Sequence, residues 1–122
     1  MNKVEYDNMV NLLIKVTDGR LLQWTEIEDG YSTTIGKCKM SLSSIYDTDV
    51  NINEYNLQLF NSEGRNFESF SCNESDEEYP LLDKLYSSVR DSIFHIKESE
   101  KNIMDNLEAM AKKIPVDDDL PF

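Results

Sequence analysis

Histidine, glycine and catalytic motifs are scarce in this chain of 122 residues. His95 is the one histidine, so a second imidazole is lacking for a histidine-based metal site. The glycines are scattered at Gly19, Gly30, Gly36 and Gly64 and do not form a phosphate-binding loop. No serine or cysteine nucleophile motif accompanies His95. The sequence therefore predicts a protein that is not an enzyme and that uses no cofactor and no metal.

Cysteine and long apolar runs are also scarce. Cys38 and Cys72 are the two cysteines, and neither has the spacing of a metal site. Because an N-terminal signal and a long apolar run are both lacking, we expect a cytoplasmic protein without a membrane partner and with reduced thiols. A disulfide between the two cysteines would require their strands to be adjacent.

Basic residues are few for a protein that binds nucleic acid. Twelve Lys and Arg stand against 24 Asp and Glu, which gives a net charge of -12. Without Asp117, Asp118 and Asp119 the charge is still -9. A protein that binds along the phosphate backbone of a nucleic acid needs a basic groove. Because this chain is strongly acidic, direct nucleic-acid binding is not expected. Sheet core is the ordinary explanation for the aromatic residues that might otherwise stack on bases, namely Trp24, Tyr31, Tyr55, Phe60, Phe67 and Phe70.

The first part of the chain predicts a helix followed by strands. Apolar residues in residues 4–17 recur at helical spacing and end at Asp18-Gly19. Alternation then predicts strands around Leu22–Trp24, 31–35 and 38–43, with a turn at 28–30. We expect 47–54 to be a polar loop, 55–60 a strand, 61–64 a hairpin turn and 65–71 the next strand. The result is an antiparallel meander of four to five strands.

One stretch of the expected fourth strand resembles a known peptide motif. Asn56-Leu57-Gln58-Leu59-Phe60 is similar to the short peptide by which many bacterial proteins bind the sliding clamp. Leu57 and Leu59 are expected to face the core, which would hide the residues that anchor such a peptide.

A long helix is expected in the C-terminal part of the chain. Residues 81–114 contain no Gly or Pro, and apolar residues recur at spacings of three and four, interrupted by Glu100. Such a helix is longer than the sheet can cover, so its distal part, about 97–114, is expected to protrude. The apolar spacing in this distal part predicts that the chain self-associates as a homodimer through Ile103, Leu107, Met110 and Ile114. The alternative is that the helix breaks near Glu98-Ser99 and folds back on the domain.

The last residues carry the clearest functional pattern. They read Asp117, Asp118, Asp119, Leu120, Pro121 and Phe122. This order resembles the acidic C-terminal tip of bacterial single-stranded-DNA-binding proteins. The resemblance implies docking to DNA-processing proteins with a basic, apolar pocket, such as helicases, nucleases and clamp-loader proteins. Phe122 and its carboxylate would enter the pocket, Pro121 would restrict the peptide, and the aspartates would face a basic rim.

These patterns together predict an α+β protein. We expect one domain over residues 1–114, with an N-terminal helix, the meander and a long C-terminal helix, followed by a flexible acidic docking tail over 115–122. Its order of elements departs from the barrel of single-stranded-DNA-binding proteins, whose helix lies between strands.

The expected function is a non-enzymatic interaction module of bacterial or phage origin. It would present the tip to proteins of DNA replication, recombination or repair, by recruitment or by competition. One alternative is an acidic DNA mimic or counter-defence inhibitor of a phage or mobile element. Its surface would use Glu26, Glu28, Asp29, Asp47, Asp49 and Glu54. Another alternative is an atypical single-stranded-DNA-binding protein.

Overall fold

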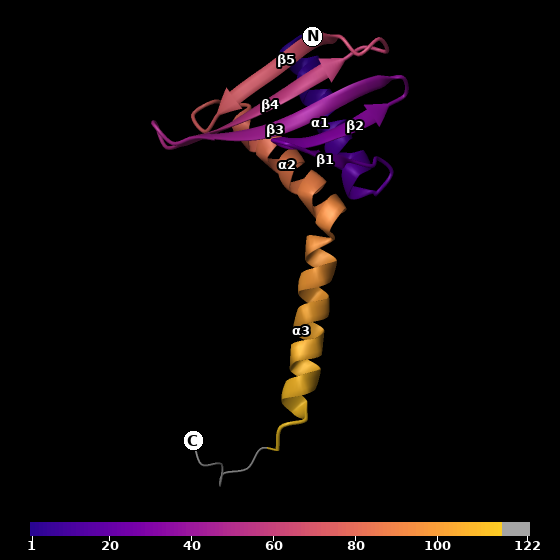
Figure 1. The fold of residues 1–122 in the computed structure, drawn as a ribbon, viewed down its shortest axis with the longest axis vertical. Helices are drawn as coiled ribbons and strands as arrows, with labels where there is room; N and C mark the ends of the chain where they lie inside the picture. Colours follow the sequence, from indigo (N-terminus) through magenta and orange to yellow (C-terminus); the bar gives the residue numbers. More distant parts are fainter. Residues whose placement is uncertain (116–122) are drawn as a thin grey trace.

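The computed structural model describes residues 1–115 and shows an α+β fold. A single sheet of five antiparallel strands lies against two helices, and a further helix extends away from the sheet (Figure 1). The elements in chain order are α1 Lys3–Asp18, β1 Thr25–Ile27, β2 Gly30–Ile35, β3 Cys38–Asp47, β4 Ile52–Phe60, β5 Asn66–Asn73, α2 Tyr79–Phe94 and α3 Ile96–Lys112.

The sheet is a meander in which strand order follows chain order, β1-β2-β3-β4-β5. Leu42 of β3 pairs with Tyr31 of β2 and with Leu57 of β4, so large side chains lie side by side on one face. Residues on the opposite face, among them Ser41, Ser43 and Gln58, are small or polar. The predicted antiparallel meander is confirmed, with five strands.

Helices α1 and α2 cover the apolar face of the sheet and run in the same direction. Lys3 near the start of α1 pairs with Glu77 just before α2, and Arg20 after α1 pairs with Asp91 near the end of α2. The core between the helices and the sheet contains fully buried apolar side chains from all three parts. They are Val10, Leu42, Leu57, Leu82, Leu85 and Val89.

Local polar contacts fix the ends of α1. The Asn2 side chain accepts a hydrogen bond of 2.8 Å from the backbone N–H of Glu5, as expected of an N-cap residue. Past the helix, the indole N–H of Trp24 donates to the Thr17 hydroxyl at 3.1 Å, and both side chains are buried. Trp24 thus enters the core just before β1, whereas the sequence placed it in a strand.

The predicted polar loop over 47–54 is wrong at both ends. Strand β3 continues to Asp47 and β4 begins at Ile52, with Asp47 opposite Ile52 and Tyr46 opposite Asn53. The hairpin reaches beyond the helices, where its backbone groups pair with each other. Such pairing does not need apolar side chains, which is why the polar sequence did not reveal it.

The predicted long helix is divided at His95. This residue has left-handed backbone angles, φ 50° and ψ 46°, so α2 ends at Phe94 and α3 starts at Ile96. The division lies three residues before Glu98, where the sequence suggested a break. However, α3 does not fold back. It continues away from the sheet, and none of its residues is buried (Figure 1).

Among residues 1–115, none of the helices is both long enough and apolar enough to cross a membrane.

Candidate interaction surfaces

The tail that the sequence singles out lies outside the described residues. This applies to Asp117, Asp118, Asp119, Leu120, Pro121 and Phe122. The described chain ends at Pro115, which is exposed and follows α3. Helix α3, which precedes it, extends away from the helix–sheet body (Figure 1).

Helix α3 carries an exposed apolar stripe. Ile103, Leu107, Met110 and Ile114 are 53 to 61% exposed, and their spacing of four, three and four places them on one side of a helix. These are the residues for which the sequence predicts self-association. Charged residues such as Lys101, Asp105 and Lys112 occupy the opposite side. The stripe has no partner within residues 1–115, and its role in self-association stays a prediction.

Charge divides the described chain into two parts. Residues 1–95 contain eight Lys and Arg and 17 Asp and Glu, so this helix–sheet body carries -9. Residues 96–113 contain four of each sign and are neutral. A second copy of the body would therefore be repelled by the first, whereas α3 meets no such net repulsion.

A second apolar surface is a groove beside α1, with a volume of about 890 Å³. We call it the apolar groove. One wall is α1 with the segment that follows it, and the other is formed by the ends of β2–β5. The residues that line it include Met9, Leu12, Val16, Leu21, Leu22, Ile35, Met40, Leu59, Phe60 and Phe67. Leu12, Leu21 and Phe67 are 60, 83 and 59% exposed, and the charged lining residues are Glu5 and Lys39.

The apolar groove and α2 lie on opposite sides of α1. Lys3, Asp7 and Asn11 line a crevice with the first turns of α2. Glu5, Met9 and Leu12 line the apolar groove. On a helix with 3.6 residues per turn these two sets point in nearly opposite directions. A helix placed in the groove would therefore lie next to α1, on the side away from α2, and would extend the helical layer.

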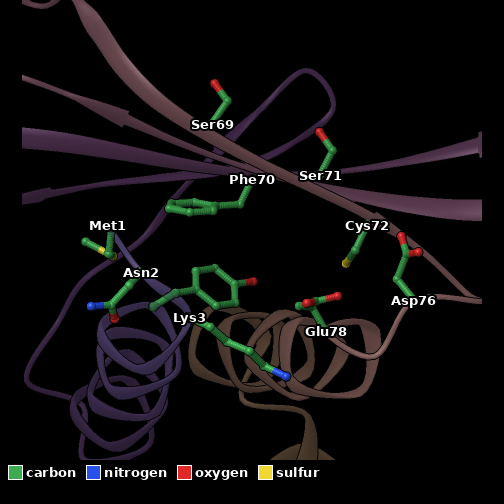
Figure 2. Close-up of a pocket in the computed structure, with 10 residues that line it drawn as sticks. Met1, Asn2, Lys3, Ser69, Phe70, Ser71, Cys72, Asp76 and Glu78 are labelled. Carbon is green, nitrogen blue, oxygen red and sulfur yellow. The ribbon is translucent and has the colours of Figure 1, made fainter.

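A third feature is a polar cleft of about 470 Å³ between the start of α1 and β5. Phe70 and Cys72 point from β5 toward the helices, whereas Ser69 and Ser71 point to the other side of the sheet (Figure 2). The ring of Tyr6 packs on Phe70 with centroids 4.6 Å apart. At the mouth, the Met1 ammonium group donates to Glu68 at 3.0 Å, and this pair raises the pKa of the ammonium group.

Two groups in the cleft are buried and protonated at neutral pH. Burial, and then the carboxylates of Asp76 and Glu78, raises the pKa of the Cys72 thiol to about 11. Burial is also the main cause of the raised pKa of Tyr6, whose hydroxyl has no hydrogen-bond partner within residues 1–115. A thiol with this pKa is a poor nucleophile at pH 7, because the thiolate is the reactive form. The chemistry of the cleft therefore does not support cysteine catalysis.

The other sequence candidates lie in the core or apart from one another. Trp24, Tyr31 and Tyr55 are buried, so they offer no platform for bases. The expectation of sheet core is wrong for Phe67, which is 59% exposed and lines the apolar groove. Leu57 and Leu59 of the clamp-like stretch are buried in β4, as the sequence predicted. Cys38 and Cys72 are both free, and β4 lies between their strands. No group of three or more metal-ligating side chains occurs in the described part of the chain.

The chain was compared with protein-family models, with curated proteins and with solved structures, and none of the three comparisons found a match.

Sequence reasoning missed the apolar groove. Its walls come from a helix and from the ends of four strands, and no local pattern joins them. The apolar spacing of the predicted helix included Leu12, and Phe67 lay in a predicted strand, but the structure leaves both more than half exposed. Such residues mark an uncovered surface when they gather in one place.

Proposed function

We propose that this chain is a non-enzymatic protein–protein interaction module that presents its acidic tip to proteins of DNA replication, recombination or repair. The observation that carries the proposal is the sequence Asp117-Asp118-Asp119-Leu120-Pro121-Phe122, which resembles the tip of single-stranded-DNA-binding proteins. The tip either recruits such a protein or competes with the host single-strand binder for its pocket.

The shape of the described chain supports this role. Helix α3, which precedes the tip in the chain, extends away from the body, so a protein that binds the tip would not have to approach the sheet closely (Figure 1). The net negative charge of the chain also supports this role. A partner with a basic pocket is attracted by the acidic body and tip together, and this attraction should weaken as salt is added.

The test measures binding of the full chain to a purified bacterial exonuclease that docks single-strand-binder tips. We expect Phe122→Ala to weaken binding at least tenfold, because the ring fills the apolar pocket. Adding one residue after Phe122 should do the same, since it moves the carboxylate away from its basic partner. Fluorescence anisotropy gives the dissociation constants.

The matched control has residues 117–122 in scrambled order, which keeps the charge and composition. If the scrambled chain or the extended chain binds as well as the original, charge alone explains the binding and the proposal fails. Binding that disappears in both variants and persists in Val50→Glu, a change on the body, supports it.

A DNA mimic is the second candidate, and one observation favours it. Residue pairing places the β1–β2 turn, with Glu28 and Asp29, and the β3–β4 turn, with Asp47 and Asp49, at the same end of the sheet. All four side chains are exposed. If the chain is a DNA mimic, it inhibits a DNA-binding protein. Changing the four acids to Asn and Gln should then abolish this inhibition, whereas Phe122→Ala should leave it unchanged.

A further inference from the structure

The described chain has two apolar surfaces without a partner, the stripe on α3 and the apolar groove beside α1. We propose that α3 of one copy docks in the apolar groove of a second copy. The new element is the surface that binds α3, namely the apolar groove. The residues predicted for self-association all lie on α3 and do not identify this surface. This inference does not depend on what the acidic tip binds.

The two surfaces match in length and spacing. On α1, the groove wall includes Glu5, Met9, Leu12 and Val16, which are separated by four, three and four residues. On α3 the stripe consists of Ile103, Leu107, Met110 and Ile114, with the same separations. Each row spans about 17 Å at 1.5 Å per residue. Rows of this kind pack when the ridges of one helix enter the grooves of another.

Charge favours α3 as the occupant and also selects its direction. The body carries -9, so an acidic occupant would be repelled, whereas residues 96–113 are neutral. If α3 runs antiparallel to α1, Lys113, which flanks the stripe, approaches Glu5 near the start of α1. Glu100, on the stripe side of α3, then approaches Lys15 near the end of α1. The opposed helix dipoles are also favourable in this direction.

A second copy fits better than the chain's own α3. Helix α1 stands between α2 and the apolar groove, and only His95 separates α2 from α3. The start of α3 is held by Asp91, whose carboxylate accepts from the backbone N–H of Lys97 at 3.0 Å. An own-chain α3 would have to pass over α1, which requires breaking this contact and unwinding the first turns. An α3 from another copy stays intact.

Reciprocal docking forms a closed two-fold dimer with two identical contacts. Each contact covers one stripe and one groove, so both apolar surfaces are removed from water. Two contacts together bring the buried area toward the roughly 1,600 Å² of a typical stable interface. Pairing of α3 with α3 makes a single contact and leaves both grooves uncovered, which makes it the less favourable arrangement.

Sedimentation equilibrium of the full chain tests the proposal. We expect a dimer at tens of micromolar. Leu107→Glu on the stripe and Leu12→Glu in the groove should each raise the dissociation constant at least tenfold. Both side chains are more than half exposed, so neither change should unfold the body. Val50→Glu, at the exposed β3–β4 turn, adds the same charge elsewhere and should leave the dimer intact.

Cross-linking identifies the receiving surface directly. Cys38 is exposed and lines the apolar groove. In Met104→Cys and Met110→Cys chains, mild oxidation should yield a disulfide-linked dimer in at least one variant, and Cys38→Ser should abolish it. A dimer that persists with Cys38→Ser would show that α3 pairs with α3.

Three results would overturn the proposal. The first is a monomer at tens of micromolar. The second is a dimer that resists Leu12→Glu but dissociates with Leu107→Glu, because that pattern belongs to α3–α3 pairing. The third is equal weakening by Val50→Glu, which would show that added charge alone drives dissociation.

Discussion

At the scale of single residues, two buried tyrosines differ in what their hydroxyl groups meet. Tyr55 donates to the Asp83 carboxylate at 2.5 Å. The Tyr6 hydroxyl has no partner within residues 1–115, although it is equally buried. A buried polar group without a hydrogen bond costs about 1–3 kcal/mol, because it has lost its contact with water and gained nothing in return. The two sites should therefore respond in opposite ways to loss of the hydroxyl.

Substitution by phenylalanine compares them. We expect Tyr6→Phe to leave stability unchanged or to raise it by up to about 1 kcal/mol, since the ring still packs on Phe70. Tyr55→Phe should lower stability by about 1 kcal/mol, because Asp83 loses its donor. Urea denaturation followed by Trp24 fluorescence measures both. An equal loss in the two variants would mean that the Tyr6 hydroxyl is hydrogen-bonded in the polar cleft.

Two exposed apolar residues, Leu12 and Phe67, show how far single positions can be interpreted from sequence. Leu12 and Phe67 looked like ordinary members of a helix and a strand, and the structure places them on the same uncovered groove. Whether an apolar side chain is covered depends on which elements reach it, and this is decided by the packing of distant segments. A residue pattern describes one element at a time, so it could predict the core residues Leu42 and Leu57 but not the groove.

At the scale of elements, the junction between α2 and α3 is held by one carboxylate. Asp91 accepts from Lys97 N–H at 3.0 Å through one oxygen, and the other oxygen lies 3.3 Å from the Arg20 guanidinium group. The left-handed conformation of His95 opposes this, because it costs a residue with a side chain about 1–2 kcal/mol. The division of the helix is therefore a close balance between strain and capping.

Asp91→Ala should shift this balance toward one continuous helix. Without the cap, which is worth about 1 kcal/mol, His95 can relax to right-handed angles. Spin labels are attached at positions 84 and 109 in a chain with Cys38→Ser and Cys72→Ala. Double electron–electron resonance then measures the distance between the two labels. A continuous helix puts 25 residues between the labelled positions, or about 37 Å.

The control for this experiment is Asp105→Ala, an exposed change within α3 that leaves the junction intact. We expect the label distance in the control to equal that of the parent chain and to be shorter than in Asp91→Ala. If Asp91→Ala leaves the distance unchanged, the carboxylate does not maintain the division.

The same junction explains why the sequence predicted a single long helix. Residues 92–98 contain neither Gly nor Pro, and the apolar spacing continues through them. The carboxylate of Asp91 that caps α3 also pairs with Arg20, 71 positions earlier in the chain, and no local pattern includes that partner. The five strands, by contrast, were predictable because alternation and turn residues are local. The β3–β4 hairpin was shortened in the prediction, since its polar tip pairs through the backbone.

At the scale of the whole molecule, the net charge is the property that follows most directly from the sequence. The body carries -9 and its buried aromatic residues are unavailable to bases. The tip, by contrast, lies outside the described residues, so its role stays a prediction from sequence order.

From this charge we expect no tight binding of single-stranded DNA. The long-range interaction with a polyphosphate chain is repulsive, and the counterions that basic residues would release are not displaced. Anisotropy titration of a labelled oligonucleotide of about 30 nucleotides at physiological salt should give a dissociation constant above about 10 micromolar. Such an affinity is no tighter than ordinary nonspecific binding.

The same titration in low salt provides the control, because repulsion between like charges grows as screening is removed. Binding should then become weaker still. Submicromolar affinity, or affinity that rises at low salt, would reveal a local basic surface and would favour the single-stranded-DNA-binding alternative.

The order of the strands has a consequence for how the chain folds during synthesis. Every strand pairs with its neighbour in sequence, so each hairpin can close over a short loop as it leaves the ribosome. The helices follow a different schedule. Helix α1 is made first, yet it packs against α2, which is made after the whole sheet. We therefore expect the part of α1 that packs on α2 to stay uncovered until Val89 has emerged, so that the nascent protein depends on chaperones longest at its own N-terminus.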